Sequence, residues 1–107
     1  HTNFSTKAMR SENGIVAIED ACEKIGQKIS EHLAVYGDKY EERLTGDHET
    51  CSFSEFKYGT ADRTASIRIP RSVADTGRGY LEDRRPNANA DPYAVASRML
   101  KTVCELN

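Results

Sequence analysis

The sequence predicts an α+β fold in which two main helices cover a small, mainly antiparallel sheet. Apolar residues recur at helical spacing in one segment near each end of the chain, and short segments between them alternate apolar with polar residues. The 107 residues, 37% hydrophobic and 30% charged, fit one small globular domain, residues 1–107. The net charge of −2 favours neither a nucleic-acid nor a membrane partner, and no apolar run approaches the ~20 residues of a membrane span.

Residues 15–36 are expected to form the first main helix, with a stop at Gly37. Its apolar face is built from residues three or four positions apart: Ile18, Cys22, Ile25, Ile29 and Leu33. Charged residues cover the opposite side. Because His32 has charged neighbours, we expect it to be a solvated surface histidine.

Two segments show no regular period. Residues 1–10 are polar and predict no element. Residues 38–62 are expected to hold loops with short strands, and a loop of this length in a small domain is often functional.

Two short strands are expected in the second half. Residues 64–70 alternate small or apolar with polar side chains and end at Pro70. A turn at Gly77 and Gly79 then leads to the second strand, residues 80–84.

The second main helix is expected to begin with Asp91 as its cap and Pro92 at its first position. Its apolar face is expected to consist of Tyr93, Ala96, Leu100, Val103 and Cys104.

The cysteine spacing and the first residues of the chain bear on the cellular compartment and on whether the chain is part of a longer protein. Cys22, Cys51 and Cys104 match no disulfide or metal pattern, so reduced thiols in a cytoplasmic protein are expected. The first residues lack the apolar stretch of a signal peptide. The first residue is His1 rather than Met, from which a fragment, a processed product or an incompletely expressed chain is expected.

Six arginines without a lysine mark residues 63–85: Arg63, Arg68, Arg71, Arg78, Arg84 and Arg85. The guanidinium fork holds phosphate or carboxylate oxygens at two points. A strand would place Arg68 opposite Ile67 and Ile69, and would place Arg84 on the same face as Glu82. This pattern suits a phosphate site with a metal, although a surface ladder of ion pairs would give the same pattern.

Four strings resemble motifs of class II glutamine synthetases, in the order of that family. Residues 1–10 (HTNFSTKAMR) resemble its nucleotide-side motif, and residues 43–50 (RLTGDHET) resemble the flap over its substrate. Residues 62–70 (DRTASIRIP) resemble its arginine strand, and residues 79–92 resemble its last site strand and helix start. Together they cover the chain from end to end. Asp47 departs from the family, which usually has an apolar or aromatic residue there.

The resemblance implies the C-terminal part of the catalytic domain of a glutamate–ammonia ligase, without its N-terminal domain. In that reaction ATP phosphorylates the glutamate side chain, and ammonia displaces phosphate from the γ-glutamyl phosphate. ATP is a substrate, and Mg²⁺ or Mn²⁺ is the cofactor. The resemblance also implies a homo-oligomer of two rings with sites between subunits. The isolated chain lacks the small domain of the neighbouring subunit, which forms one side of the site, and most of the acidic metal ligands. It is therefore expected to be inactive.

The resemblance also implies roles for individual residues. The metal ligands are His1 and Glu82, and the ATP contacts are Asn3, Ser5, Arg63 and Tyr80. Substrate glutamate contacts Arg43 and Arg84, while the catalytic residues are Arg68 on the phosphate and Glu49 as the flap base. Arg85 is expected to be structural, and His48 is given no ligand role.

Two other functions remain open at this point. One is a standalone remnant that binds nucleotide or glutamate without turnover. The other is a related ligase that joins glutamate to polyamines or other amines, because the amine pocket is not legible in the sequence.

Overall fold

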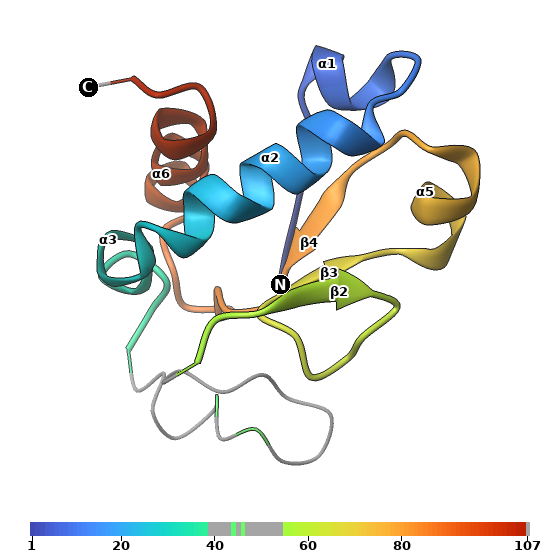
Figure 1. Ribbon diagram of the computed structural model, residues 1–107. Helices are drawn as coiled ribbons and strands as arrows, with labels where there is room; N and C mark the ends of the chain where they lie inside the picture. Colours follow the sequence, from blue (N-terminus) through green and yellow to red (C-terminus); the bar gives the residue numbers. More distant parts are fainter. Residues whose placement is uncertain (39–43, 45, 47–54, 107) are drawn as a thin grey trace.

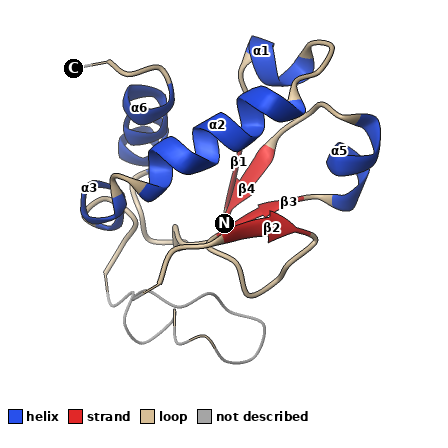
Figure 2. Cartoon of the chain, viewed as in Figure 1, coloured by secondary structure: helices blue, strands red, loops and turns tan. Residues whose placement is uncertain are grey.

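The computed structural model describes residues 1–38, 44, 46 and 55–106, which form five helices and four strands (Figure 1 and Figure 2). In chain order these are β1 (Thr2–Phe4), α1 (Lys7–Arg10), α2 (Ile15–Gly26), α3 (Ile29–Leu33), β2 (Tyr58–Thr60), β3 (Ile67–Ile69), α5 (Arg71–Thr76), β4 (Leu81–Asp83) and α6 (Pro92–Val103). Helices α2 and α6, with 12 residues each, are the two main helices, so the predicted α+β class is confirmed. None of the described helices is long and apolar enough to cross a membrane.

The four strands form one sheet in the order β1-β4-β3-β2. Strand β4 pairs antiparallel with both β1 and β3, whereas β2 pairs parallel with β3. The sheet is therefore mainly antiparallel, as predicted, with one parallel pair at the β2 edge. The central position of β4 matters for the site because its side chains have neighbours on both sides.

Helix α2 covers one face of this sheet and packs beside α6 (Figure 1). The apolar face predicted for the first helix is confirmed for its α2 part, since Ile18, Cys22 and Ile25 are fully buried. The other two predicted residues, Ile29 and Leu33, lie on α3, where Leu33 is buried and Ile29 half-buried. They form one cluster with the inward side chains of the strands, which include Ile67 and Leu81. Polar residues lie on the opposite face of the sheet.

The expected single helix over residues 15–36 is wrong, because the chain leaves the helical path after Gly26. Lys28 has φ −129° and ψ 37°, and α3 starts one residue later in a new direction. The ring of Phe56 packs against Gly26 so closely that a Cβ there would lie 2.7 Å from it. A contact between residues 30 positions apart leaves no trace in helical periodicity.

The expectation that His32 is solvated is also wrong: its side chain is fully buried. Helix α3 turns it inward, where both ring nitrogens find hydrogen-bond partners, Tyr36 and Thr102. Burial is tolerated because no polar atom of the ring is left unsatisfied.

The start of α6 is confirmed: Asp91 accepts a hydrogen bond from the Tyr93 backbone nitrogen at 2.9 Å. Its expected apolar face is wrong. Tyr93 is 85% and Leu100 46% exposed, while the buried residues are Val95, Met99 and Thr102. Shifting the face by one position turns a helix by about 100°, and the inward side is set by contacts with α2 and α3.

Three elements escaped prediction. Strand β1 and helix α1 lie in residues 1–10, where three- and four-residue elements are too short to show a period. Helix α5 begins directly after Pro70, where the expected strand ends, and it stops at Gly77, whose φ of 77° favours glycine.

Candidate active site on the open face of the sheet

Three of the predicted site residues lie side by side in one row across the sheet. Glu82 on β4 is paired with Asn3 on β1 and with Arg68 on β3. Directly paired residues project from the same face. Arg68 is flanked by the buried Ile67 and Ile69, so this face is the one turned away from the core, as predicted.

The Glu82 carboxylate is the centre of a charged cluster. Its Oε1 atom lies 2.9 Å from Arg68 Nε and 3.6 Å from Arg84 Nε, and its Oε2 atom lies 3.5 Å from His1 Nδ1. We call these four residues the Glu82 cluster. Glu82 is only 14% exposed, so its charge is less screened by water than a surface charge. The cluster therefore places the guanidinium groups of Arg68 and Arg84 against one carboxylate.

Arg68 forms an ion pair with Glu82 that does not use all of its guanidinium nitrogens. Arg68 Nε and Glu82 Oε1 are in ion-pair contact but are not aligned for a hydrogen bond. Within the part of the chain that the structure describes, the terminal nitrogens of Arg68 have no hydrogen-bond partner. In this position the terminal nitrogens of the guanidinium group can donate to the oxygens of a ligand.

Arg84 ties the cluster to the loop that carries Arg63. Its Nη1 atom donates to the Arg63 carbonyl oxygen, and its backbone nitrogen donates to Ser66 at 2.9 Å. These contacts bring the Arg63 backbone to the edge of the cluster. The prediction that Glu82 and Arg84 share a strand face is confirmed by their ion pair.

The donors of His1 and Glu82 fit a divalent cation. Two ligands about 2.1 Å from one octahedral cation lie about 3.0 Å apart, and the observed separation is 3.5 Å. The His1 side chain is 48% exposed, so a small rotation can close the difference. No group of three or more metal-ligating side chains occurs among the described residues, so this pair would supply two ligands.

The other predicted site residues do not join the cluster. Ser5 and Tyr80 lie at the far end of strands β1 and β4, where the Ser5 hydroxyl donates to the Gly79 carbonyl at 2.7 Å. Tyr80 is half-buried and packs against the core. Arg43 and Glu49 lie outside the described residues.

Directly beneath the cluster lies a buried ion pair that sequence reasoning missed. Arg85 is 2% exposed, and its Nε and Nη2 atoms donate to the two oxygens of the fully buried Asp83 at 2.9 and 2.8 Å. Asp83 and Arg85 are two residues apart, the same spacing that separates Glu82 from Arg84 on the other face. The same alternation rule could therefore have found the pair, and the structural role expected for Arg85 is confirmed.

A chain of hydrogen bonds extends this pair into the helices. The Tyr36 hydroxyl donates to Asp83 Oδ2 at 2.7 Å, so it accepts from His32 Nδ1 at 2.6 Å. His32 Nε2 in turn accepts from the Thr102 hydroxyl at 2.8 Å. Burial, followed by the nearby positive charge of Arg85, lowers the pKa of His32 to about 4, so the ring is neutral at pH 7.

Comparisons with known proteins were made for the whole chain. It is 56% identical over 104 residues to the glutamine synthetase of Tuber borchii, a match that covers 97% of the chain and 29% of that protein. It is 57% identical over 104 residues to the glutamine synthetase of Kluyveromyces lactis, covering 97% of the chain and 28% of that protein. The chloroplastic glutamine synthetase of Chlamydomonas reinhardtii is 57% identical over 103 residues, covering 96% and 27%. No family model matches the chain.

The chain thus spans slightly less than a third of the length of the curated relatives it matches. The matches cover 97%, 97% and 96% of the chain, and therefore include the strands that carry Arg68 and Glu82. More than half of the matched positions are identical in each of these three relatives. Over nearly its whole length the chain matches a part of glutamine synthetase.

Proposed function

We propose that these residues are the C-terminal part of the catalytic domain of a glutamate–ammonia ligase. The full-length protein would make glutamine from glutamate, ammonia and ATP through a γ-glutamyl phosphate. The observation that carries the proposal is the Glu82 cluster, in which Arg68, Arg84 and His1 surround one carboxylate on the open face of the sheet. The proteins that match the chain are named glutamine synthetases, which also supports the proposal.

The arginines would stabilise charge on the transferred phosphoryl group. In the first step a glutamate carboxylate oxygen attacks the γ-phosphorus of ATP and ADP leaves. Arg68, with its unused terminal nitrogens, and Arg63 would bind phosphoryl oxygens, while Arg84 would hold glutamate or its phosphorylated form. Nucleotide contacts would come from Asn3, Ser5 and Tyr80.

His1 and Glu82 would hold a divalent cation near the phosphates. A carboxylate with an imidazole suits Mg²⁺ or Mn²⁺, and Mn²⁺ tolerates the nitrogen ligand better. When bound, such a cation neutralises charge on the phosphate oxygens. Glu82 Oε2 faces His1, while Oε1 faces the arginines, so one side chain would serve both.

The remaining roles belong to the segment of residues 43–50. Arg43 would bind substrate glutamate, and Glu49 would accept a proton as the nitrogen of ammonia attacks the acyl carbon and phosphate leaves. A closed flap over the acyl phosphate would also exclude water.

The assembly and location follow the same proposal. The full-length protein would be a cytoplasmic homo-oligomer of two rings with sites between subunits, so that a neighbouring chain completes each site. One relative is named as chloroplastic, so the compartment of this protein must be tested separately.

Two alternative functions differ in their products. A γ-glutamyl-amine ligase would use the same phosphate site but join glutamate to an organic amine. A standalone remnant would bind nucleotide or glutamate without turnover.

The test is an assay of the purified full-length protein with glutamate, ammonium, ATP and Mg²⁺. We expect glutamine and phosphate in equal amounts, and loss of both in a Glu82→Ala variant. The matched control is Glu105→Ala, a 71% exposed glutamate that should leave the rate unchanged. Product formed only with an organic amine would favour the first alternative, and ATP binding without product would favour the second.

A further inference from the structure

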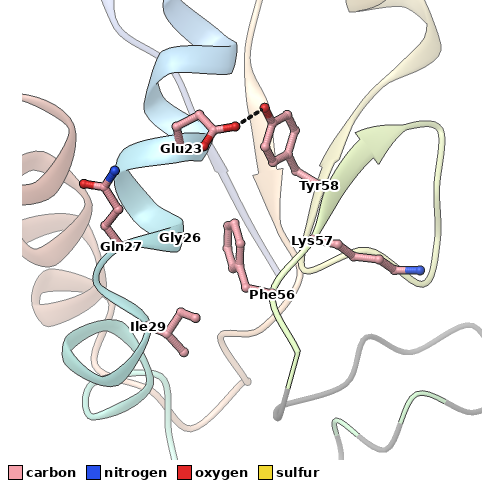
Figure 3. A pocket seen from close by; sticks show the side chains of 7 residues that line it. All are labelled: Glu23, Gly26, Gln27, Ile29, Phe56, Lys57 and Tyr58. Atoms are coloured by element: carbon pink, nitrogen blue, oxygen red, sulfur yellow. Dashed lines mark hydrogen bonds between the residues drawn. The ribbon is translucent and has the colours of Figure 1, made fainter.

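An open hollow of about 570 Å³ lies between the C-terminal end of α2 and the segment that leads into β2 (Figure 3). This is within the ~300–1,000 Å³ of small-molecule sites. Tyr58, which lines it, is paired with the buried Ile67, so the hollow lies on the helix-covered side of the sheet. It is therefore separated from the Glu82 cluster by the sheet itself.

One end of the hollow presents a carboxylate. The Tyr58 hydroxyl donates to Glu23 Oε1 at 2.6 Å and fixes the carboxylate across the gap between α2 and β2 (Figure 3). Within the described residues, Glu23 Oε2 has no hydrogen-bond partner. That oxygen remains available for a donor on a ligand.

The floor of the hollow is apolar. The ring of Phe56 stands between α2 and β2 with Ile29 below it, and both are half-buried (Figure 3). Gly26 makes this arrangement possible, because a Cβ at that position would lie 2.7 Å from the Phe56 ring. Lys57 extends away from Phe56 (Figure 3), so it adds no positive charge at the Glu23 end.

We infer that the hollow is an effector site for a small organic ammonium ion with an apolar body. The ammonium group donates to Glu23, and the apolar body covers the ring of Phe56 and the side chain of Ile29. An ammonium ion also gains from a nearby aromatic face. An anion of the same shape is excluded because it meets the Glu23 carboxylate.

The contacts of Phe56 couple the hollow to the reacting side of the sheet. The Arg85 guanidinium carbon lies 5.2 Å from the centre of the Phe56 ring. Arg85 is in turn paired with Asp83, the last residue of β4, and the other face of this strand carries Glu82, which contacts Arg84. A ligand that holds Phe56 in place therefore also restrains the Arg85–Asp83 ion pair at the end of β4.

Calorimetric titration of the full-length protein with phenethylammonium tests the binding step. We expect saturable binding at millimolar concentration or below, and no binding of phenylacetate, an anion of similar size. Glu23→Gln should weaken binding at least tenfold, since it replaces a charge-assisted hydrogen bond with a neutral one. Glu31→Gln, an exposed glutamate on α3, is the control and should bind like the parent. Equal binding by the Glu23→Gln variant, or equal binding of phenylacetate, would overturn the assignment.

The coupling step rests on the proposed function, because it is measured through ATP. Saturating phenethylammonium should tighten ATP binding by about fivefold, at the lower end of typical allosteric couplings. A Phe56→Leu variant, which keeps the apolar floor but loses the ring over Arg85, should lose this effect. An ATP affinity unchanged by the amine would refute the coupling. A full-length protein that binds the amine but never ATP would refute the proposed function and leave the hollow standing as a binding site.

Discussion

The stability of the protein should fall as the pH drops below 6.5, because His32 is buried in its neutral form. In the folded chain its pKa is lowered to about 4, whereas the unfolded chain takes up the proton near the ordinary value of 6.5. Protons then bind the unfolded state first, so the stabilisation is complete above pH 6.5 and is lost towards pH 4. The charged groups that act on the ring are Arg85, which follows β4, Asp83 at the end of β4, and Arg98 on α6.

The size of the effect follows from the two pKa values. At pH 5, protonation of the unfolded chain lowers the free energy of unfolding by about 2 kcal/mol relative to pH 7. The geometry supports this sign. A second proton on the ring would turn Nε2 into a donor, and the Thr102 hydroxyl, which already accepts from Arg98 Nε at 3.3 Å, would lose its acceptor.

The assay is chemical unfolding of the full-length protein at pH 7 and pH 5, beside a His32→Gln variant that cannot titrate. Carboxylates titrate alike in both proteins, so the difference between the two pH dependences isolates His32. We expect the parent to lose about 2 kcal/mol more than the variant between these pH values. Parallel losses would refute the argument, even if the variant were less stable at both pH values.

The remaining predictions concern catalysis. In the full-length protein, Arg84→Ala should lower kcat/KM by about 10²-fold or more, whereas Arg78→Ala, at an exposed turn, should have little effect; equal activities would contradict the role of Arg84. Glu49→Ala should leave ATP binding nearly intact, slow ammonia attack by about 10²–10⁴-fold and raise the ratio of phosphate released to glutamine formed; turnover like that of the parent would make Glu49 a bystander. The purified 107-residue chain alone should make no glutamine from glutamate, ammonia and ATP, and turnover above a buffer control would refute the need for the rest of the catalytic domain.

Sequence reasoning succeeded where one residue's neighbours along the chain decide its environment. The alternation of Ile67, Arg68 and Ile69 placed the arginine on the open face, and the spacing of Glu82 and Arg84 placed them together. The Asp91 cap was legible for the same reason, since its partner is two residues away. In each case the pattern is local, and the backbone geometry of a strand or helix end converts it into a position.

Sequence reasoning failed where the residue that determines the environment of a side chain is distant along the chain. Gly26, the last residue of α2, packs against Phe56, 30 residues further along, and the buried His32 is hydrogen-bonded to Thr102, 70 residues further along. The inward face of α6 depends on contacts with α2 and α3, which the amphipathic pattern of α6 alone does not contain. Strand β1 has three residues and is recognisable only through its pairing with β4.

The segment around β4 carries the residues of the Glu82 cluster on one face and a buried ion pair on the other. Glu82 and Arg84 point to the open face, while Asp83 and Arg85 form the buried ion pair that anchors the network of Tyr36. Loss of one member of such a pair leaves the other charge buried and costs about 3–5 kcal/mol. A variant of Asp83 or Arg85 should therefore impair ligand binding by displacing the strand, even though neither side chain lies on the face of the cluster. The positions of Arg68 and Arg84 are then only as precise as the buried network beneath them.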